Sequence, residues 1–204
     1  MTAQSLLQLV KAPLHPSPLD ASALVIIDAQ LEYVSGKLPL EGIDAAILEA
    51  AKLLKLARSR GVPVFHVVHH GPAGAPLFDE TTPQGAIVPL LTPAPGEVVL
   101  RKTLPNAFAG TDLDALIKST SRREIIFAGF MTHMCISASV RAALDLNYRS
   151  TVVAAATATR DLPDPLGGRI PASIVHRTAL AELADRFAIV VKDTAALLPQ
   201  QATA

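Results

Sequence analysis

The stretch EIIFAGFMTHMCISASVRAALDLN, residues 124–147, joins a strand pattern to a helix pattern at the only cysteine of the chain. Its first part, EIIFA, is a short continuous apolar run, which is typical of a fully buried strand. Its last part, ISASVRAALDLN, has a helical pattern, and we expect a helix from about residue 134 to residue 146. Cys135 is therefore expected at the corner where a buried strand is followed by a helix.

The same alternation of buried strands and helices extends in both directions from this corner. The expected strands are residues 23–28, 62–68, 97–102, 123–129, 150–156 and 188–191, and the expected helices are residues 43–60, 112–119, 134–146 and 172–187. Strands that alternate with helices indicate right-handed βαβ units. We expect an α/β fold of the doubly wound, Rossmann-like type, a six-stranded parallel sheet with helices on both faces.

The length of 204 residues favours a single domain, residues 1–204, with a Pro-rich N-terminal arm over residues 1–20. The segment from His69 to Gly96 is rich in proline and glycine. We expect it to form a long loop, which in a compact domain is usually a functional or interface element.

The composition excludes several classes of partner. The formal net charge is +0, which gives no electrostatic reason to expect nucleic acid. No apolar run approaches the roughly 18 residues of a membrane span, and the N-terminus lacks a signal-peptide pattern. We expect a cytoplasmic protein with a small-molecule substrate and no membrane association. The apolar content of 50% also predicts a homo-oligomer, a dimer or a tetramer.

Asp28, Lys102 and Cys135 each follow the C-terminal end of an expected strand. Ligands of doubly wound sheets bind beyond these strand ends, so the three side chains are expected on one edge of the sheet. Together they supply an acid/base, a cation and a nucleophile. We expect the helix N-terminus and Lys102 to favour the Cys135 thiolate and so to lower the pKa of the thiol. The alternative is an inert buried cysteine beside a solvated surface lysine.

Cofactor motifs are missing from the sequence. The first strand is followed by DAQLEYVSG rather than by a G-x-G-x-x-G loop, and there is no Walker-type phosphate loop. The chain has no C-x-x-C pair of the kind that binds structural zinc. We expect no cofactor.

Three motifs carry a resemblance to a known family. They are VIIDAQLEY at the first strand, RKTLPNAF around the lysine and GFMTHMCISASVRAA around the cysteine. In the order and spacing of these motifs, the chain resembles the isochorismatase-like cysteine hydrolases, a family that includes nicotinamidases and N-carbamoylsarcosine amidase. The resemblance extends from about residue 23 to residue 191. The resemblance implies that Asp28, Lys102 and Cys135 are a catalytic triad. It also implies a cis peptide bond before Met131, with the amides of Met131 and Cys135 as an oxyanion hole.

Two departures from the family pattern stand out. Nicotinamidases bind a metal through an Asp-x-His motif, but the region after Tyr33 has none, so we expect no catalytic metal. Relatives also often carry an aspartate where this chain has Ala155 and Ala156.

Five further residues are candidates for substrate binding. They are Tyr33, His70, Phe108, Thr132 and His133. Core packing is the alternative for Tyr33 and Phe108. Of the neighbouring histidines His69 and His70, one is expected to line the pocket, and an ordinary strand-end position is the alternative for both.

These observations predict a metal-independent cysteine hydrolase that cleaves a C–N bond of a small amide, lactam or carbamoyl compound through a thioester acyl-enzyme. One alternative is a vinyl ether hydrolase of the isochorismatase type, which needs no thiol. A second is a non-catalytic ligand-binding or assembly subunit on the same fold.

Overall fold

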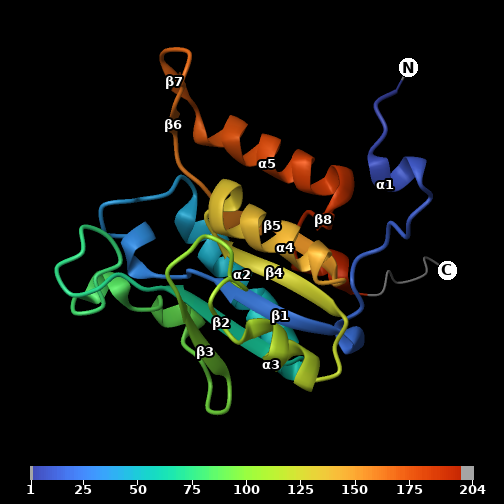
Figure 1. Ribbon diagram of the computed structural model, residues 1–204, viewed down its shortest axis with the longest axis horizontal. Coiled ribbons are helices and arrows are strands. Elements are labelled where there is room, and N and C mark those ends of the chain that lie inside the picture. The colour runs from blue at the N-terminus through green and yellow to red at the C-terminus, as the bar shows by residue number, and fades with distance from the viewer. Residues whose placement is uncertain (1, 199–204) are drawn as a thin grey trace.

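The computed structural model describes residues 2–198 and contains the expected six-stranded parallel sheet (Figure 1). The strand order is β3-β2-β1-β4-β5-β8. The strands are β1 (Ser22–Ile27), β2 (Val64–His69), β3 (Val98–Lys102), β4 (Glu124–Phe130), β5 (Arg149–Ala158) and β8 (Ile189–Val191). The order reverses between β1 and β4, which is where a doubly wound sheet forms its ligand crevice. The predicted fold class is confirmed.

Helices cover both faces of the sheet, and each face has its own hydrophobic core. The helices that pack on the sheet are α2 (Ile43–Ser59), α3 (Leu113–Ser119), α4 (Ser137–Asp145) and α5 (Ala172–Arg186). Leu24 and Ile26 of β1 face the core beneath α2, whereas Val25 and Ile27 face the core beneath α3, α4 and α5. Strands buried on both faces account for the continuous apolar runs in the sequence.

The structure differs from the sequence prediction in four segments. The arm contains a short helix, α1 (Leu6–Leu9), which lies beside the end of α5 (Figure 1). The segment after β2 includes 3₁₀ turns at Pro83–Gly85 and Pro89–Leu91. The helix expected from residue 134 consists of a π-helical turn, Thr132–Ile136, followed by α4. A small hairpin of β6 (Leu162–Pro163) and β7 (Arg169–Ile170) was not predicted and projects from the body of the protein (Figure 1).

Within residues 2–198, no helix is both long enough and apolar enough to cross a membrane.

Gly129 is required where β1 and β4 approach each other beside the crevice. Its φ is +115°, and a Cβ at this position would lie 2.0 Å from the carbonyl oxygen of Ile27. That neighbour is the backbone of a central strand, so it has little freedom to move away. Any side chain here must therefore disrupt the pairing that places the residues after both strands.

We expect Gly129→Ala to destabilise the protein by about 3 kcal/mol or more, because it combines a backbone clash with a positive φ. Gly61→Ala is the matched control, since Gly61 also has a positive φ, +63°, but has open space around its Cβ position. The control should cost about 1–2 kcal/mol. Urea unfolding of both variants measures the difference, and equal losses would contradict the role of the close approach.

Candidate active site

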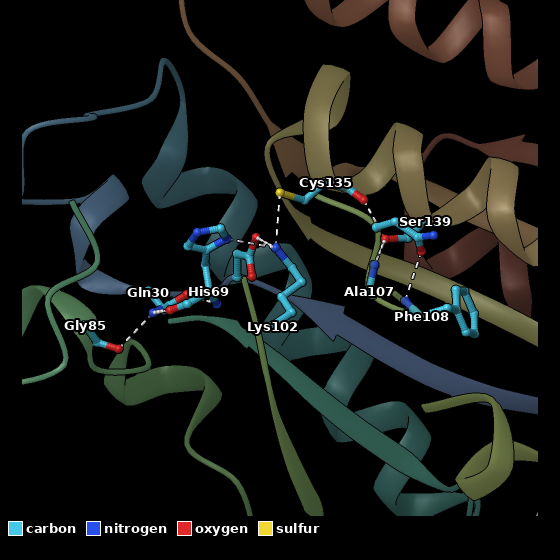
Figure 2. Close-up of polar contacts among 10 residues, drawn as sticks. Gln30, His69, Gly85, Lys102, Ala107, Phe108, Cys135 and Ser139 are labelled. Atoms are coloured by element: carbon cyan, nitrogen blue, oxygen red, sulfur yellow. Dashed lines mark hydrogen bonds and ion pairs between the residues drawn. The ribbon is translucent and has the colours of Figure 1, made fainter. Parts of the chain in front are cut away.

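The three residues predicted from the strand ends converge around the ammonium of Lys102. Figure 2 shows this ammonium between His69 and Cys135. Its Nζ lies 2.7 Å from Asp28 Oδ2 and 3.3 Å from Cys135 Sγ. A third contact, of 3.3 Å, joins it to Nδ1 of His69. An ammonium has three N–H donors and no acceptor, so these contacts use all of them.

The sheet holds the two charged residues of the site. Asp28 follows β1 directly with φ +50°, and its amide donates to the carbonyl of Val67 over 2.7 Å. Lys102 is the last residue of β3 and lies opposite His69 in the register of β2 and β3. The charged ends of both side chains are fully buried. Sheet pairing therefore fixes the backbone on either side of the ion pair.

Cys135 is presented by the π-helical turn after β4. The peptide bond between Phe130 and Met131 is cis, as the resemblance implied, and the amide of Ile136 donates to the carbonyl of Met131 over 3.2 Å. Ser139 links this turn to the loop after β3 (Figure 2). Its hydroxyl donates to the carbonyl of Cys135 over 2.7 Å and accepts from the amide of Ala107 over 2.9 Å. Sequence reasoning missed Ser139, although its position four residues after the cysteine places both on one helix face.

The expectation of a lowered thiol pKa is wrong for this resting site. Cys135 is only 5% exposed, and burial together with the negative charge of Asp28 raises the pKa of the thiol to about 12, although Lys102 opposes the shift. Burial disfavours any charged form, and here it outweighs the favourable lysine. The thiol is thus protonated at neutral pH and needs a base in order to become a nucleophile.

Asp28 is placed to be that base. Burial raises the pKa of its carboxyl group, whereas Lys102 lowers it, and the net direction is upward. Oδ2 is bonded to Lys102, but Oδ1 has no hydrogen-bond partner among the described residues, although it is buried. A buried carboxylate oxygen without a donor is a costly arrangement, which is typical of a functional site.

Of the two strand-end histidines, His69 lies beside the ammonium of Lys102. Burial and the charge of Lys102 lower the pKa of His69 to about 4, so the ring is neutral at physiological pH and accepts a hydrogen bond from Lys102 at Nδ1. His70 instead lies 3.3 Å from Glu80 Oε2. The pairing of β2 and β3 explains this difference. His69 is the last residue of β2 and lies opposite Lys102, whereas His70 is the next residue and lies beyond the strand.

Gln30 fixes the backbone of His69 and was also missed (Figure 2). Its side-chain amide donates to the carbonyl of His69 over 2.9 Å, and its carbonyl accepts from the amide of His69 over 2.8 Å. A further bond of 2.9 Å reaches the carbonyl of Gly85. Gln30 thereby attaches the long segment after β2 to the site.

The two aromatic candidates for substrate binding are packed against other rings. Tyr33 is 1% exposed and makes edge-to-face contacts with Phe78 and Phe130. Phe108 stacks against Tyr148 at a centroid distance of 6.2 Å, and its ring points away from Lys102 and Cys135 in Figure 2. For Phe108 the alternative of core packing describes its position, because it is partly buried and packs against the core beneath α3, α4 and α5.

The two polar candidates next to the cysteine have different surroundings. Thr132 is completely buried and bonded to Ala158 and His176, so it presents no surface to a substrate. His133 is half-buried, with Nδ1 2.5 Å from Thr159 Oγ1 and with Nε2 lacking a hydrogen-bond partner among the described residues. Burial lowers the pKa of His133, which keeps its ring neutral.

Metal-binding geometry is not found at the histidines of β2. His66 contacts Glu97 over 2.9 Å, so its partner differs from those of His69 and His70. Within residues 2–198, no three side chains of the His, Cys, Asp and Glu types are grouped in a way that could hold a metal ion. The prediction of a metal-independent site therefore remains one for experiment.

Comparisons with known proteins identify the family of the chain. The family model described as the isochorismatase domain matches residues 22–195. The crystal structure of an isochorismatase from Pseudomonas putida KT2440 is 41% identical, covers 97% of this chain and 100% of its own, and superposes with a TM-score of 0.91.

Two curated relatives extend the comparison. A protein named secreted isochorismatase effector Isc1, from Verticillium dahliae, is 38% identical over 170 residues, which is 83% of this chain and 87% of that protein. A ureidoacrylate amidohydrolase from Rhizobium rhizogenes is 28% identical over 189 residues and covers 74% of this chain and 77% of its own. The match of the family model over most of the chain and the similarity to these relatives show that the chain belongs to the isochorismatase family.

Proposed function

We propose that this isochorismatase-family hydrolase is a metal-independent cysteine hydrolase that cleaves a C–N bond of a small amide, lactam or carbamoyl compound. The observation that carries the proposal is the contact of one buried ammonium, that of Lys102, with both the Asp28 carboxylate and the Cys135 sulfur. A relative named as an amidohydrolase supports the same chemistry.

The first step forms a thioester. Asp28 takes the proton of the Cys135 thiol, and Sγ attacks the substrate carbonyl carbon. Lys102 stabilises the sulfur as it gains negative charge, and it also keeps the carboxylate in place. The raised pKa of Asp28 suits this task, because a base of higher pKa accepts a proton from a thiol more readily.

The second half of the step expels the amine. The carbonyl oxygen becomes negatively charged in the tetrahedral intermediate, and we assign the amides of Met131 and Cys135 to hold it. Asp28 then gives its proton to the leaving nitrogen, the C–N bond breaks and the thioester remains. Water, deprotonated by Asp28, attacks the thioester, and the acid product leaves as the thiol is re-formed.

The burial of the site supports a small substrate. Asp28 and Lys102 are 0% and 2% exposed, so the 5% exposed Cys135 is the main point of contact for an entering molecule. A cytoplasmic location stays a prediction, and one relative is named as a secreted protein.

The alternatives make different use of the sulfur. A vinyl ether hydrolase of the isochorismatase type needs no thiol, and a non-catalytic subunit needs no buried base beside it. The unpartnered Oδ1 of Asp28, in a buried site with Cys135, favours the cysteine hydrolase over both.

Cys135→Ala and Asp28→Asn should each lower turnover by at least about 10³-fold, because each removes a partner that bond cleavage requires. A panel of small amides, lactams and carbamoyl compounds, assayed for ammonia or amine release, provides the substrate. With a slow substrate, intact-protein mass spectrometry after an acid quench should detect the acyl group on the peptide THMCISASVR.

A chelator is the control for the metal-free claim, and EDTA should leave the rate unchanged. Turnover of an amide without an adduct, together with a near-normal rate for Cys135→Ser, would refute the nucleophilic mechanism. Loss of activity in EDTA that zinc restores would refute the metal-free part alone.

The pH dependence should have an acid limb that belongs to Asp28. The base works only when ionised, so kcat/KM should fall as the pH drops through the pKa of Asp28, which burial raises above the ordinary value of about 3.9.

Alkylation of Cys135 by iodoacetamide at pH 8 should be slower than that of free cysteine, because the pKa of the thiol is raised to about 12. Stopped assays at several pH values measure kcat/KM, and the rate of adduct formation measures the alkylation of Cys135. An alkylation rate above that of free cysteine would indicate a resting thiolate and contradict this assignment.

A homo-oligomer, a dimer or a tetramer, is the expected form in solution. Large apolar side chains of the N-terminal arm are exposed, namely Leu6, Leu9, Val10 and Leu14. Such a group of side chains on one segment favours a contact with another subunit. Light scattering at micromolar concentration should give a multiple of the chain mass of 21.4 kDa, and a monomeric mass would refute the prediction.

A further inference from the structure

Thr132 links the turn that carries the nucleophile to a residue outside the triad. It is the first residue of the π-helical turn and follows Met131, to which we assigned an oxyanion-hole amide. Its side chain is fully buried. Its Oγ1 lies 3.1 Å from the carbonyl oxygen of Ala158, at the end of β5, and 2.9 Å from Nδ1 of His176 on α5.

The number of available protons determines the direction of these two hydrogen bonds. The Thr132 hydroxyl has one proton, and the carbonyl of Ala158 can only accept. If the hydroxyl donates to Ala158, it still has lone pairs with which to accept a proton from His176. Both bonds form only if His176 carries a proton on Nδ1. If the hydroxyl donates to His176 instead, the buried carbonyl loses this donor.

His176 is otherwise separate from the catalytic machinery. It lies 44 positions after Thr132 and borders a groove of about 650 Å³ between α2, β5 and α5. Burial lowers the pKa of His176, so its ring is neutral at pH 8. The hydrogen bonds of the described residues include none from the ring to Asp28, Lys102 or Cys135. Thr132 is thus the polar link between His176 and the turn that carries the nucleophile.

We propose that His176 is a positioning residue, which donates from Nδ1 to Thr132 and thereby holds the Met131–Cys135 turn in its reactive geometry. The inference rests on the proposed function. The chain of bonds runs from α5 through one hydroxyl to the end of β5, and it fixes the first residue of the turn from two directions. Without the histidine the hydroxyl can rotate, and the turn loses this hydrogen bond to α5. The oxyanion donors would then shift relative to the sulfur, which affects the transition state more than substrate binding.

The kinetic test compares three substitutions of His176. His176→Ala should lower kcat by about 10- to 100-fold and leave KM within about threefold, since a misplacement of about 1 Å costs a rate factor of this order. His176→Asn should recover most of the loss, because the Asn amide nitrogen is as many bonds from Cα as Nδ1 is. His176→Gln, whose amide nitrogen matches Nε2, should not recover it.

Ser173→Ala is the matched control. Ser173 lies on α5, three residues before His176, and borders the same groove. This variant should keep the wild-type kcat. Thermal melting of every variant shows whether it is folded. Equal rates for the Asn and Ala variants, or a normal kcat for His176→Ala, would overturn the proposal.

A double-mutant cycle tests whether the effect passes through Thr132. Thr132→Val removes the hydroxyl at nearly constant shape and should lower kcat by about as much as His176→Ala. Residues in one hydrogen-bond chain are not additive, so the double variant should be no slower than the slower single variant. Multiplicative losses would mean that the two residues act independently, and would overturn the inference.

Nuclear magnetic resonance provides a test that needs no substrate. At pH 8 the ring ¹⁵N spectrum of the wild-type protein, assigned by difference from His176→Asn, should show a protonated Nδ1. The backbone amide signals of Met131 and Cys135 should shift in His176→Ala and return towards wild-type positions in His176→Asn. An unprotonated Nδ1, or amide signals that do not respond, would overturn the inference whatever the activity. If the signals respond but no amide is hydrolysed, the proposed function fails and the positioning role stands.

Discussion

The site depends on one buried ion pair, between Asp28 and Lys102, whose charged atoms lie 2.7 Å apart with no side-chain exposure. Removing two charges from water costs several kcal/mol per ion, and only close contact with further hydrogen bonds offsets this cost. The fold supplies those contacts. The central strands hold Asp28, the register of β2 and β3 places His69 opposite Lys102, and the cysteine sulfur takes the third donor of the ammonium. Loss of either charge would leave the other buried and unpaired.

The same burial determines how the thiol can react. A thiolate beside Asp28 would place two negative charges next to one ammonium, and the burial that favours the ion pair disfavours the additional charge. The resting site is therefore a thiol, a carboxylate and an ammonium, with one carboxylate oxygen left without a donor. In the proposed reaction the Asp28 carboxylate receives the proton of Cys135, and this oxygen has no other hydrogen bond to give up. The neutral ring of His69 adds no charge to this balance.

Much of the site was predictable because functional groups follow strand ends in a doubly wound sheet. Asp28, Lys102 and Cys135 were found in this way, and the structure brings them together. The surroundings of the other candidates depend on details as small as one residue. His69 ends β2 and faces Lys102, whereas His70 lies one residue beyond the strand and contacts Glu80. Thr132 was expected to bind substrate but turns towards β5 and α5, because it begins an irregular turn whose side-chain directions follow no simple period.

The sequence by itself determined the fold class and the order of strands and helices, and it identified Asp28, Lys102 and Cys135 as candidates for the catalytic residues. Apolar periodicity is local, and each strand end is marked by the residues that immediately follow it. The tertiary structure alone decided which atoms touch. The bonds of Ser139 to Ala107, of Gln30 to Gly85 and of Thr132 to His176 join segments that are 32, 55 and 44 positions apart. The protonation of Cys135 was likewise decided by burial, which depends on how all the surrounding elements pack and therefore cannot be read from any short stretch of the chain.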